Sequence, residues 1–222
     1  TQPISSQQGL LSTIAWQLGE NQPLEYALEG GAFICGAAVQ WLRDGLGLIQ
    51  ESAEVEALAA SVTSSEGVEF VPALSGLGAP YWVPDATGMI TGLTRGSTKA
   101  HLARATLEAM ALQNVDLLQA MQKDLAKPLK ELRVDGGATA NNLLMQIQAD
   151  YLGVSTQRPQ NLETTVMGAA YLAGLGAGVW NHRDEISQIW QQERSFRPLL
   201  SESERQQRLT AWHQALERVL KS

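Results

Sequence analysis

The run RVDGGATANN at residues 133–142 constrains the fold of this chain more than any other stretch. Before it, Leu132 and Val134 form a short apolar run that stops at Asp135 and two glycines. After it, apolar residues at helical spacing begin again at Leu143. This pattern predicts a strand, a tight turn and a helix.

The turn has features that suit a polar ligand. Gly136 and Gly137 carry no β-carbons, so a flat ligand or a phosphate chain can lie against bare backbone. The helix start, with Thr139 or Asn141 as candidate caps, would present unpaired N–H groups and a partial positive charge to an anion. The same run also fits a plain connection in an α/β domain, so the motif alone leaves nucleotide binding open.

Composition and charge exclude some classes of function. The chain has 222 residues, of which 44% are hydrophobic and 18% are charged, and this suits one large globular domain or two small ones. Lys and Arg total 16 against 23 Asp and Glu, a net charge of -7, and the basic residues are scattered. We therefore expect no nucleic-acid partner.

The single cysteine and the absence of long apolar runs bear on location. Cys35 cannot form an internal disulfide, which suits a reducing cytoplasm. The sequence shows neither a leader peptide nor an uncharged apolar run long enough to span a membrane, so we expect no membrane contact. The chain begins at Thr1 without a methionine, and we interpret it as a fragment of a longer protein.

The order of expected elements predicts an α/β domain. Strands are expected at residues 10–17 and 23–28, which form a hairpin, and at 68–71, 88–93 and 154–158. Helices are expected at residues 32–48, 52–60, from Ser97 or Thr98 onward, at 165–177 and in the tail. Strands that alternate with helices in this way form a sheet flanked by helices, whose ligands gather at the carboxyl ends of the strands.

A glycine inside the expected helix 32–48 stands out. Gly36 and Gln40 are four residues apart and share one helix face. A glycine within a helix costs about 1 kcal/mol relative to alanine. Its presence indicates that a ligand or a neighbouring helix approaches closely, and the sequence leaves both readings open.

Several stretches together resemble one family, the FGGY carbohydrate kinases. A signature of that family looks like residues 88–93, followed after seven residues by His101 and Leu102 and then by residues 105–108. Within the family, further stretches are similar to the glycerol kinase subfamily: residues 26–30, 40–44, 76–82, 92–96, 133–137 and 168–174. These stretches extend over nearly the whole chain.

The resemblance implies a ribonuclease H-like fold of the actin, Hsp70 and sugar kinase superfamily, with a mixed sheet flanked by helices. Two such domains close over ATP and a polyol, and this chain is similar to the second. The resemblance further implies that Gly36, Gln40, Gly137 and Asn141 contact the nucleotide. Residues 1–222 would thus be the C-terminal, nucleotide-binding half, with a core at about 9–180 and a helical extension at about 181–222.

The implied reaction transfers the γ-phosphate of ATP, with Mg2+, to glycerol. The catalytic aspartate and the glycerol-binding residues of the family have no match here, so we expect no catalytic residue and no metal ligand in this chain and no turnover by it alone. Asp135 and Asp85 are candidates for a catalytic carboxylate, and we assign that role to neither. Asp135 is expected to order the turn through backbone hydrogen bonds, and Asp85 lies in a loop.

The resemblance also implies a homo-oligomer for the full-length protein. Two alternatives stay open: another FGGY kinase, acting on xylulose or gluconate, or a non-catalytic nucleotide-binding module of the actin type.

Overall fold

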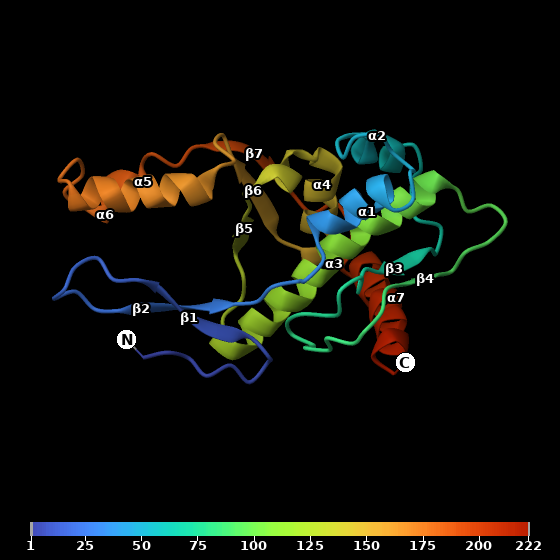
Figure 1. The fold of residues 1–222 in the computed structure, drawn as a ribbon, viewed down its shortest axis with the longest axis horizontal. Helices are drawn as coiled ribbons and strands as arrows, with labels where there is room; N and C mark the ends of the chain where they lie inside the picture. Colours follow the sequence, from blue (N-terminus) through green and yellow to red (C-terminus); the bar gives the residue numbers. More distant parts are fainter. Residues whose placement is uncertain (1, 222) are drawn as a thin grey trace.

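The computed structural model describes residues 2–221, and its helices and strands alternate along the chain as expected (Figure 1). The strands are β1 (Leu11–Trp16), β2 (Glu25–Glu29), β3 (Glu69–Val71), β4 (Met89–Thr91), β5 (Glu131–Arg133), β6 (Ser155–Pro159) and β7 (Gln192–Phe196). The helices are α1 (Gly36–Asp44), α2 (Glu54–Ala60), α3 (Lys99–Leu125), α4 (Asn142–Leu152), α5 (Thr164–Gly176), α6 (Arg183–Ser187) and α7 (Glu202–Leu220), with a short 3₁₀ helix η1 (Gly137–Ala140) before α4.

The expected hairpin is confirmed. β1 and β2 pair antiparallel, with Leu11 opposite Glu29, and Gln22 closes the turn by donating its N–H to the carbonyl of Gly19 at 3.0 Å. The hairpin projects from the rest of the molecule as a two-stranded arm (Figure 1).

The expected mixed sheet is present in part. β5 and β6 pair parallel and β7 joins β6 antiparallel, giving the order β5-β6-β7. The other strands do not join it: among residues 2–221, β1 with β2 and β3 with β4 form two separate antiparallel pairs. The strands therefore lie in three small sheets instead of one.

Helix α3 is the axis of the core. It spans 27 residues, which corresponds to about 40 Å of helix. Thr98 caps its start together with His101, and Ala126 ends it in the left-handed conformation. Helices α1, α2 and α4 pack along one side of α3 and α7 along another (Figure 1). Its buried positions include Leu107, Met110 and Leu112.

Residues 181–222 contain more than the expected helical extension. They include β7, which is part of the three-stranded sheet, and α7, which packs in the main core. Trp212 of α7 is fully buried and donates its indole N–H to Asp116 of α3 at 2.6 Å. This tail is therefore integral to the fold.

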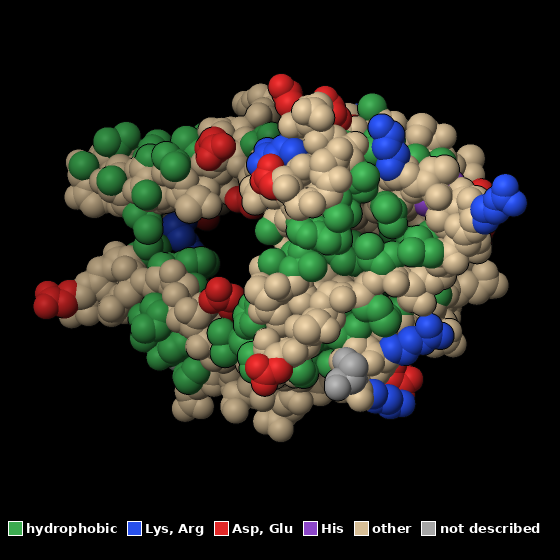
Figure 2. Space-filling view, turned by 45° about the vertical axis from the view of Figure 1, so that its right-hand side comes forward, with side chains coloured by type: hydrophobic (Ala, Val, Ile, Leu, Met, Phe, Trp, Pro, Cys, Tyr) green, Lys and Arg blue, Asp and Glu red, His purple; other side chains and the backbone are tan. Residues whose placement is uncertain are grey.

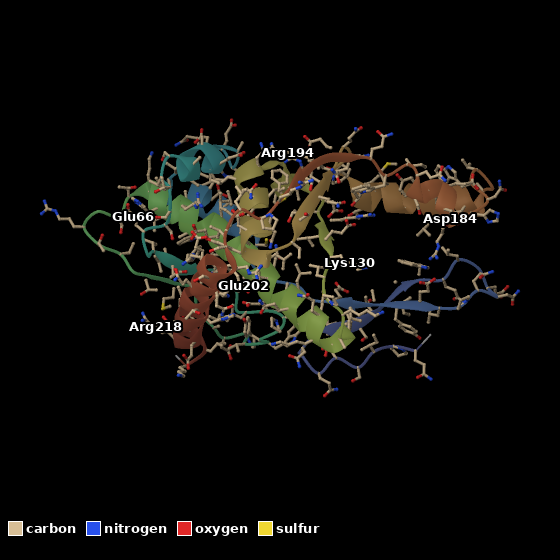
Figure 3. The ribbon with its side chains drawn as sticks, turned by 180° about the vertical axis from the view of Figure 1, so that it is seen from behind. Glu66, Lys130, Asp184, Arg194, Glu202 and Arg218 are labelled. Carbon is tan, nitrogen blue, oxygen red and sulfur yellow. The ribbon has the colours of Figure 1, made fainter. Side chains whose placement is uncertain are left out.

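Helices α5 and α6 form a second arm, which runs beside the hairpin (Figure 1). Figure 3 places Asp184 of α6 near the tip of this arm. Helix α5 is rich in small residues, but Gly174 is its only buried residue, against the ring of Trp180. None of the helices within residues 2–221 is long and apolar enough to cross a membrane.

Candidate functional site

The four positions expected to contact a nucleotide lie around one cavity. Gly36, Gln40, Gly137 and Asn141 all line a hollow of about 410 Å³ between the starts of α1 and α4. Its apolar wall comes from Val39, Val55, Leu107, Met110 and Leu144. A hollow of this size with an apolar wall and a few polar groups is typical of a small-molecule site.

Two glycines leave the cavity open, and a third shapes the turn. A β-carbon built on Gly36 or on Gly137 meets no atom within 4 Å, so both face empty space. Gly136 has a φ of 81°, a conformation that favours glycine. Gly136 is therefore needed by the backbone, while Gly36 and Gly137 are where a ligand can approach it.

Asn141 has a defined structural role. Its Oδ1 accepts the N–H of Leu144 at 2.8 Å, so Asn141 is the cap of α4. Thr139, the other candidate cap, instead donates its hydroxyl to the carbonyl of Gly136 at 2.7 Å. Because the Oδ1 of Asn141 is engaged, the Nδ2 amide group is the part of the side chain left to donate to a ligand.

Glu56 of α2 is a wall residue that sequence reasoning missed. Its Oε1 accepts the N–H of Leu143 at 3.1 Å, across from α2 to the start of α4. Together with the Asn141 cap, this contact satisfies two of the N–H groups that we expected to be unpaired. The N–H groups that precede the first intrahelical bond of η1, at Gly137 and Ala138, are better placed to meet an anion.

Arg158 of β6 holds the turn from behind, and sequence reasoning also missed it. The side chain is buried, and its guanidinium donates to the carbonyl oxygens of Thr139 (2.7 Å) and Ala140 (3.3 Å) and to Oδ1 of Asn142 (3.0 Å). It also pairs with Glu193 at 2.8 Å. The sequence feature that could have indicated this role is the single arginine within the strand expected at residues 154–158.

Asp135 does not order the turn as expected. Within residues 2–221 its carboxylate has no hydrogen-bond or ion-pair partner, and Arg158 performs the ordering instead. The same part of the chain contains no group of three or more His, Cys, Asp or Glu side chains that could hold a metal ion. The site is therefore built for binding through backbone and amide groups.

The sequence profile of the FGGY family of carbohydrate kinases, C-terminal domain, matches residues 1–177. A glycerol kinase of Bdellovibrio bacteriovorus is 65% identical over 216 residues, which are 97% of this chain and 43% of that protein. A glycerol kinase of Herminiimonas arsenicoxydans is 57% identical over 99% of this chain and 44% of its own length. The chain thus spans less than half the length of these curated relatives.

Solved structures agree with this likeness. The crystal structure of Plasmodium falciparum glycerol kinase with ADP matches with a TM-score of 0.90 and 33% identity, over 99% of this chain and 44% of that one. A xylulose kinase from Lactobacillus acidophilus shares the fold, with a TM-score of 0.78 over 90% of this chain and 42% of that one at 24% identity. The expected ribonuclease H-like class of the sugar kinases is confirmed by these neighbours.

Proposed function

This chain belongs to the FGGY family of carbohydrate kinases, and on that premise we propose that it is the nucleotide-binding half of a glycerol kinase. The complete protein would transfer the γ-phosphate of ATP to glycerol, giving glycerol 3-phosphate and ADP, as a cytoplasmic homo-oligomer. One observation carries the proposal for this half: the four expected nucleotide contacts line a single cavity whose two glycines face open space.

The cavity suits the adenosine part of ATP. The wall of Leu107, Met110 and Leu144 offers an apolar surface to the flat base. Asn141 would donate its Nδ2 amide to a ring nitrogen, and Gln40 would border the base on the opposite helix. Gly137 would let the ribose and the first phosphate approach the N–H groups of η1.

These residues position ATP and do not react with it. Phosphoryl transfer depends chiefly on alignment and on stabilisation of charge, so a precise nucleotide cradle is a direct contribution to the rate. Because the described residues offer no metal-ligand cluster, Mg2+ would be held by the phosphates and by the rest of the longer protein. The base that takes the glycerol proton would also come from there, and closure of the two halves would exclude water from the γ-phosphate.

The activity is tested with the full-length protein. ADP release is measured with ATP and Mg2+ in the presence of glycerol, of pentuloses, of hexonates, or of no acceptor. Glycerol-dependent release is the expected result. Release only with another polyol would replace glycerol kinase by a different FGGY kinase, and nucleotide binding without release would favour the non-catalytic module.

The site assignment has its own test. Gly137→Val fills the approach to the backbone and is expected to weaken ADP binding at least tenfold, by calorimetric titration. Gly176→Val is the matched control, because Gly176 is also exposed and also meets no atom within 4 Å, but it lies at the end of α5 away from the cavity. Equal ADP affinity of the two variants would refute the site.

A further inference from the structure

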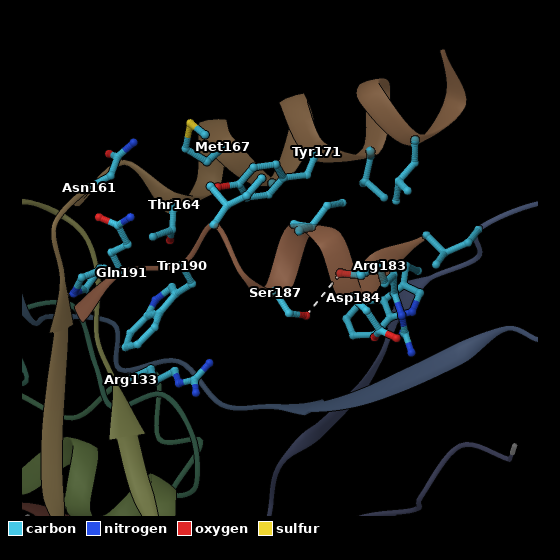
Figure 4. A pocket seen from close by; sticks show the side chains of 18 of the residues that line it. Arg133, Asn161, Thr164, Met167, Tyr171, Arg183, Asp184, Ser187, Trp190 and Gln191 are labelled. Atoms are coloured by element: carbon cyan, nitrogen blue, oxygen red, sulfur yellow. Dashed lines mark hydrogen bonds between the residues drawn. The ribbon is translucent and has the colours of Figure 1, made fainter. Parts of the chain in front are cut away.

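Two cavities of the molecule differ in how they can select a ligand. The larger of the two has a volume of about 720 Å³ and lies between the two arms, where Figure 2 shows its opening. Met167, Tyr171 and Trp190 line it (Figure 4). Large apolar and aromatic side chains of this kind select a ligand by shape. The smaller, proposed nucleotide cavity instead carries polar side chains that are fixed in place.

These fixed side chains are bound to consecutive N–H groups at the start of α4. Glu56 of α2 accepts the N–H of Leu143 with its Oε1 at 3.1 Å. Asn141 accepts the N–H of Leu144 with its Oδ1 at 2.8 Å. Successive N–H groups in the first turn of a helix lie close together. The carboxylate of Glu56 and the amide of Asn141 are therefore neighbours, and both residues line the cavity.

The two hydrogen bonds determine which atoms are left for a ligand. Asn141 keeps its Nδ2 group, which can only donate. Glu56 keeps Oε2, which has no hydrogen-bond or ion-pair partner among residues 2–221 and, in a carboxylate, can only accept. Gln40 also lines the cavity, but no such bond holds its amide, which can turn to offer either group. The wall thus presents one fixed donor beside one fixed acceptor.

Adenine carries the complementary pair of groups. Its exocyclic amine at position 6 donates, and the ring nitrogens on either side of that position, N1 and N7, accept. Guanine and hypoxanthine carry an oxygen at position 6 instead, so in the same pose an acceptor would face the Oε2 of Glu56. Glu56 is only half-buried by the protein, but a base in the cavity would displace the water around this oxygen. Two unpaired acceptors that face each other away from water weaken binding.

We propose that Glu56 selects adenine nucleotides by accepting the N6 amine with its Oε2, while Asn141 donates to the ring nitrogen beside it. This inference rests on the proposed function, because it names the base that the nucleotide cavity takes. A 6-oxo base can turn an N–H group toward Glu56 only by rotating in its own plane. That rotation would carry the ribose away from the N–H groups of η1 at Gly137 and Ala138.

A purely structural role for Glu56 is the competing explanation. In that case the residue would serve only to join α2 to α4, through the bond from Leu143 to its Oε1. Glu56→Gln separates the two roles, because glutamine keeps an oxygen for the N–H of Leu143 but replaces the free Oε2 by an amide group that donates. The choice of base then changes only if Oε2 faces the base.

A series of nucleotides tests the proposal on the unaltered full-length protein. Calorimetric titration with Mg2+ compares ADP, purine riboside diphosphate, which has hydrogen at position 6, and inosine diphosphate (IDP), which has oxygen there. Purine riboside diphosphate is expected to bind about tenfold more weakly than ADP, because it lacks the donor, and IDP more weakly still. Equal affinities for the three nucleotides overturn the proposal, and this test needs no variant to fold.

Substitution then assigns the selection to Glu56. In Glu56→Gln, the ratio of the dissociation constants of IDP and ADP is expected to fall at least about tenfold, because the new amide donates to the oxygen of IDP and opposes the amine of ADP. Glu54→Gln is the matched control. Glu54 lies on the same helix and accepts the N–H of Gln50 with its Oε2 at 2.9 Å, but it does not line the cavity. Its substitution removes the same charge and should leave the ratio unchanged.

The outcomes separate this inference from the proposed function. ADP binding that Gly137→Val weakens, together with an IDP to ADP ratio that Glu56→Gln does not change, keeps the nucleotide site and overturns the role of Glu56. Equal changes of the ratio in Glu56→Gln and Glu54→Gln also overturn it, since charge alone would then explain the effect. ADP binding that is insensitive to Gly137→Val would place the nucleotide elsewhere and refute both.

Discussion

Arg158→Met isolates the contribution of the buried guanidinium that holds the glycine-rich turn. Methionine refills most of the space but donates no hydrogen bond. The substitution leaves the carbonyl of Thr139 and the Oδ1 of Asn142 without this donor, next to the proposed nucleotide cavity. Both the stability of the protein and the shape of the turn at Gly137 depend on these contacts.

The magnitude follows from the contacts. A hydrogen bond from a charged donor is worth about 1.5–3 kcal/mol. The contact to Thr139 is buried and the contact to Asn142 is partly buried. The pair with Glu193 is half exposed and adds at most about 1 kcal/mol. Taking the lower end of that range for each of the two contacts, we expect a loss of roughly 3 kcal/mol, which corresponds to a fall in Tm of about 6–12 °C for a domain of this size.

Arg194→Met is the matched control. Arg194 donates to the same Oδ1 of Asn142 at 3.2 Å and lies over the ring of Phe196, as Arg158 does, but it is exposed. We expect its loss to lower Tm by less than about 3 °C. Differential scanning fluorimetry measures both, and titration with ADP and Mg2+ should show weaker binding for Arg158→Met only. Equal effects of the two substitutions would refute the reasoning.

Three further predictions concern single residues. Gly136→Ala should cost roughly 1–2 kcal/mol in urea denaturation, because φ at this position is 81°. Asn141→Asp should keep the helix cap and Tm but lose the amide donor, so that ADP binding measured by calorimetry weakens about tenfold. The hydrogen bond to Asp116 raises the pKa of His213 above 6.5. The stability that this hydrogen bond gives to the fold is therefore fully present below that pH and is lost as the pH rises through the folded-state pKa. His213→Gln should flatten this part of the profile of unfolding free energy against pH, measured by urea denaturation.

Each of these has a contradicting outcome. An unchanged free energy of unfolding in Gly136→Ala would mean that the turn does not need the positive φ of Gly136. A fall in Tm for Asn141→Asp would show that the amide supports the fold and not only a ligand. If the unfolding free energy depends on pH in the same way with and without His213, other groups cause that dependence.

Local sequence patterns predicted much of the secondary structure. The strand, glycine turn and helix around Gly136 follow from residue types whose backbone preferences are local, and the hairpin follows from its turn residues. The exact cap was left open between Thr139 and Asn141, because both residue types suit that position and only the structure shows that Asn141 occupies it.

Contacts between distant residues could not be read in the same way. Nothing in residue spacing brings Gly36 near Gly137, about one hundred positions away, and the family resemblance alone suggested it. The roles of Glu56 and Arg158 depend on how α2 and β6 are placed relative to the turn. Likewise, strand patterns do not reveal which strands pair, so one sheet was expected where the structure has three.

The length of α3 has a mechanical consequence. Leu107 and Met110 line the proposed nucleotide cavity, while Leu117, two turns farther along the same helix, packs against Leu10 at the base of the hairpin. A helix resists bending over so short a distance, so these two regions keep a fixed separation. The cavity and the base of the hairpin therefore move together, because α3 connects them rigidly.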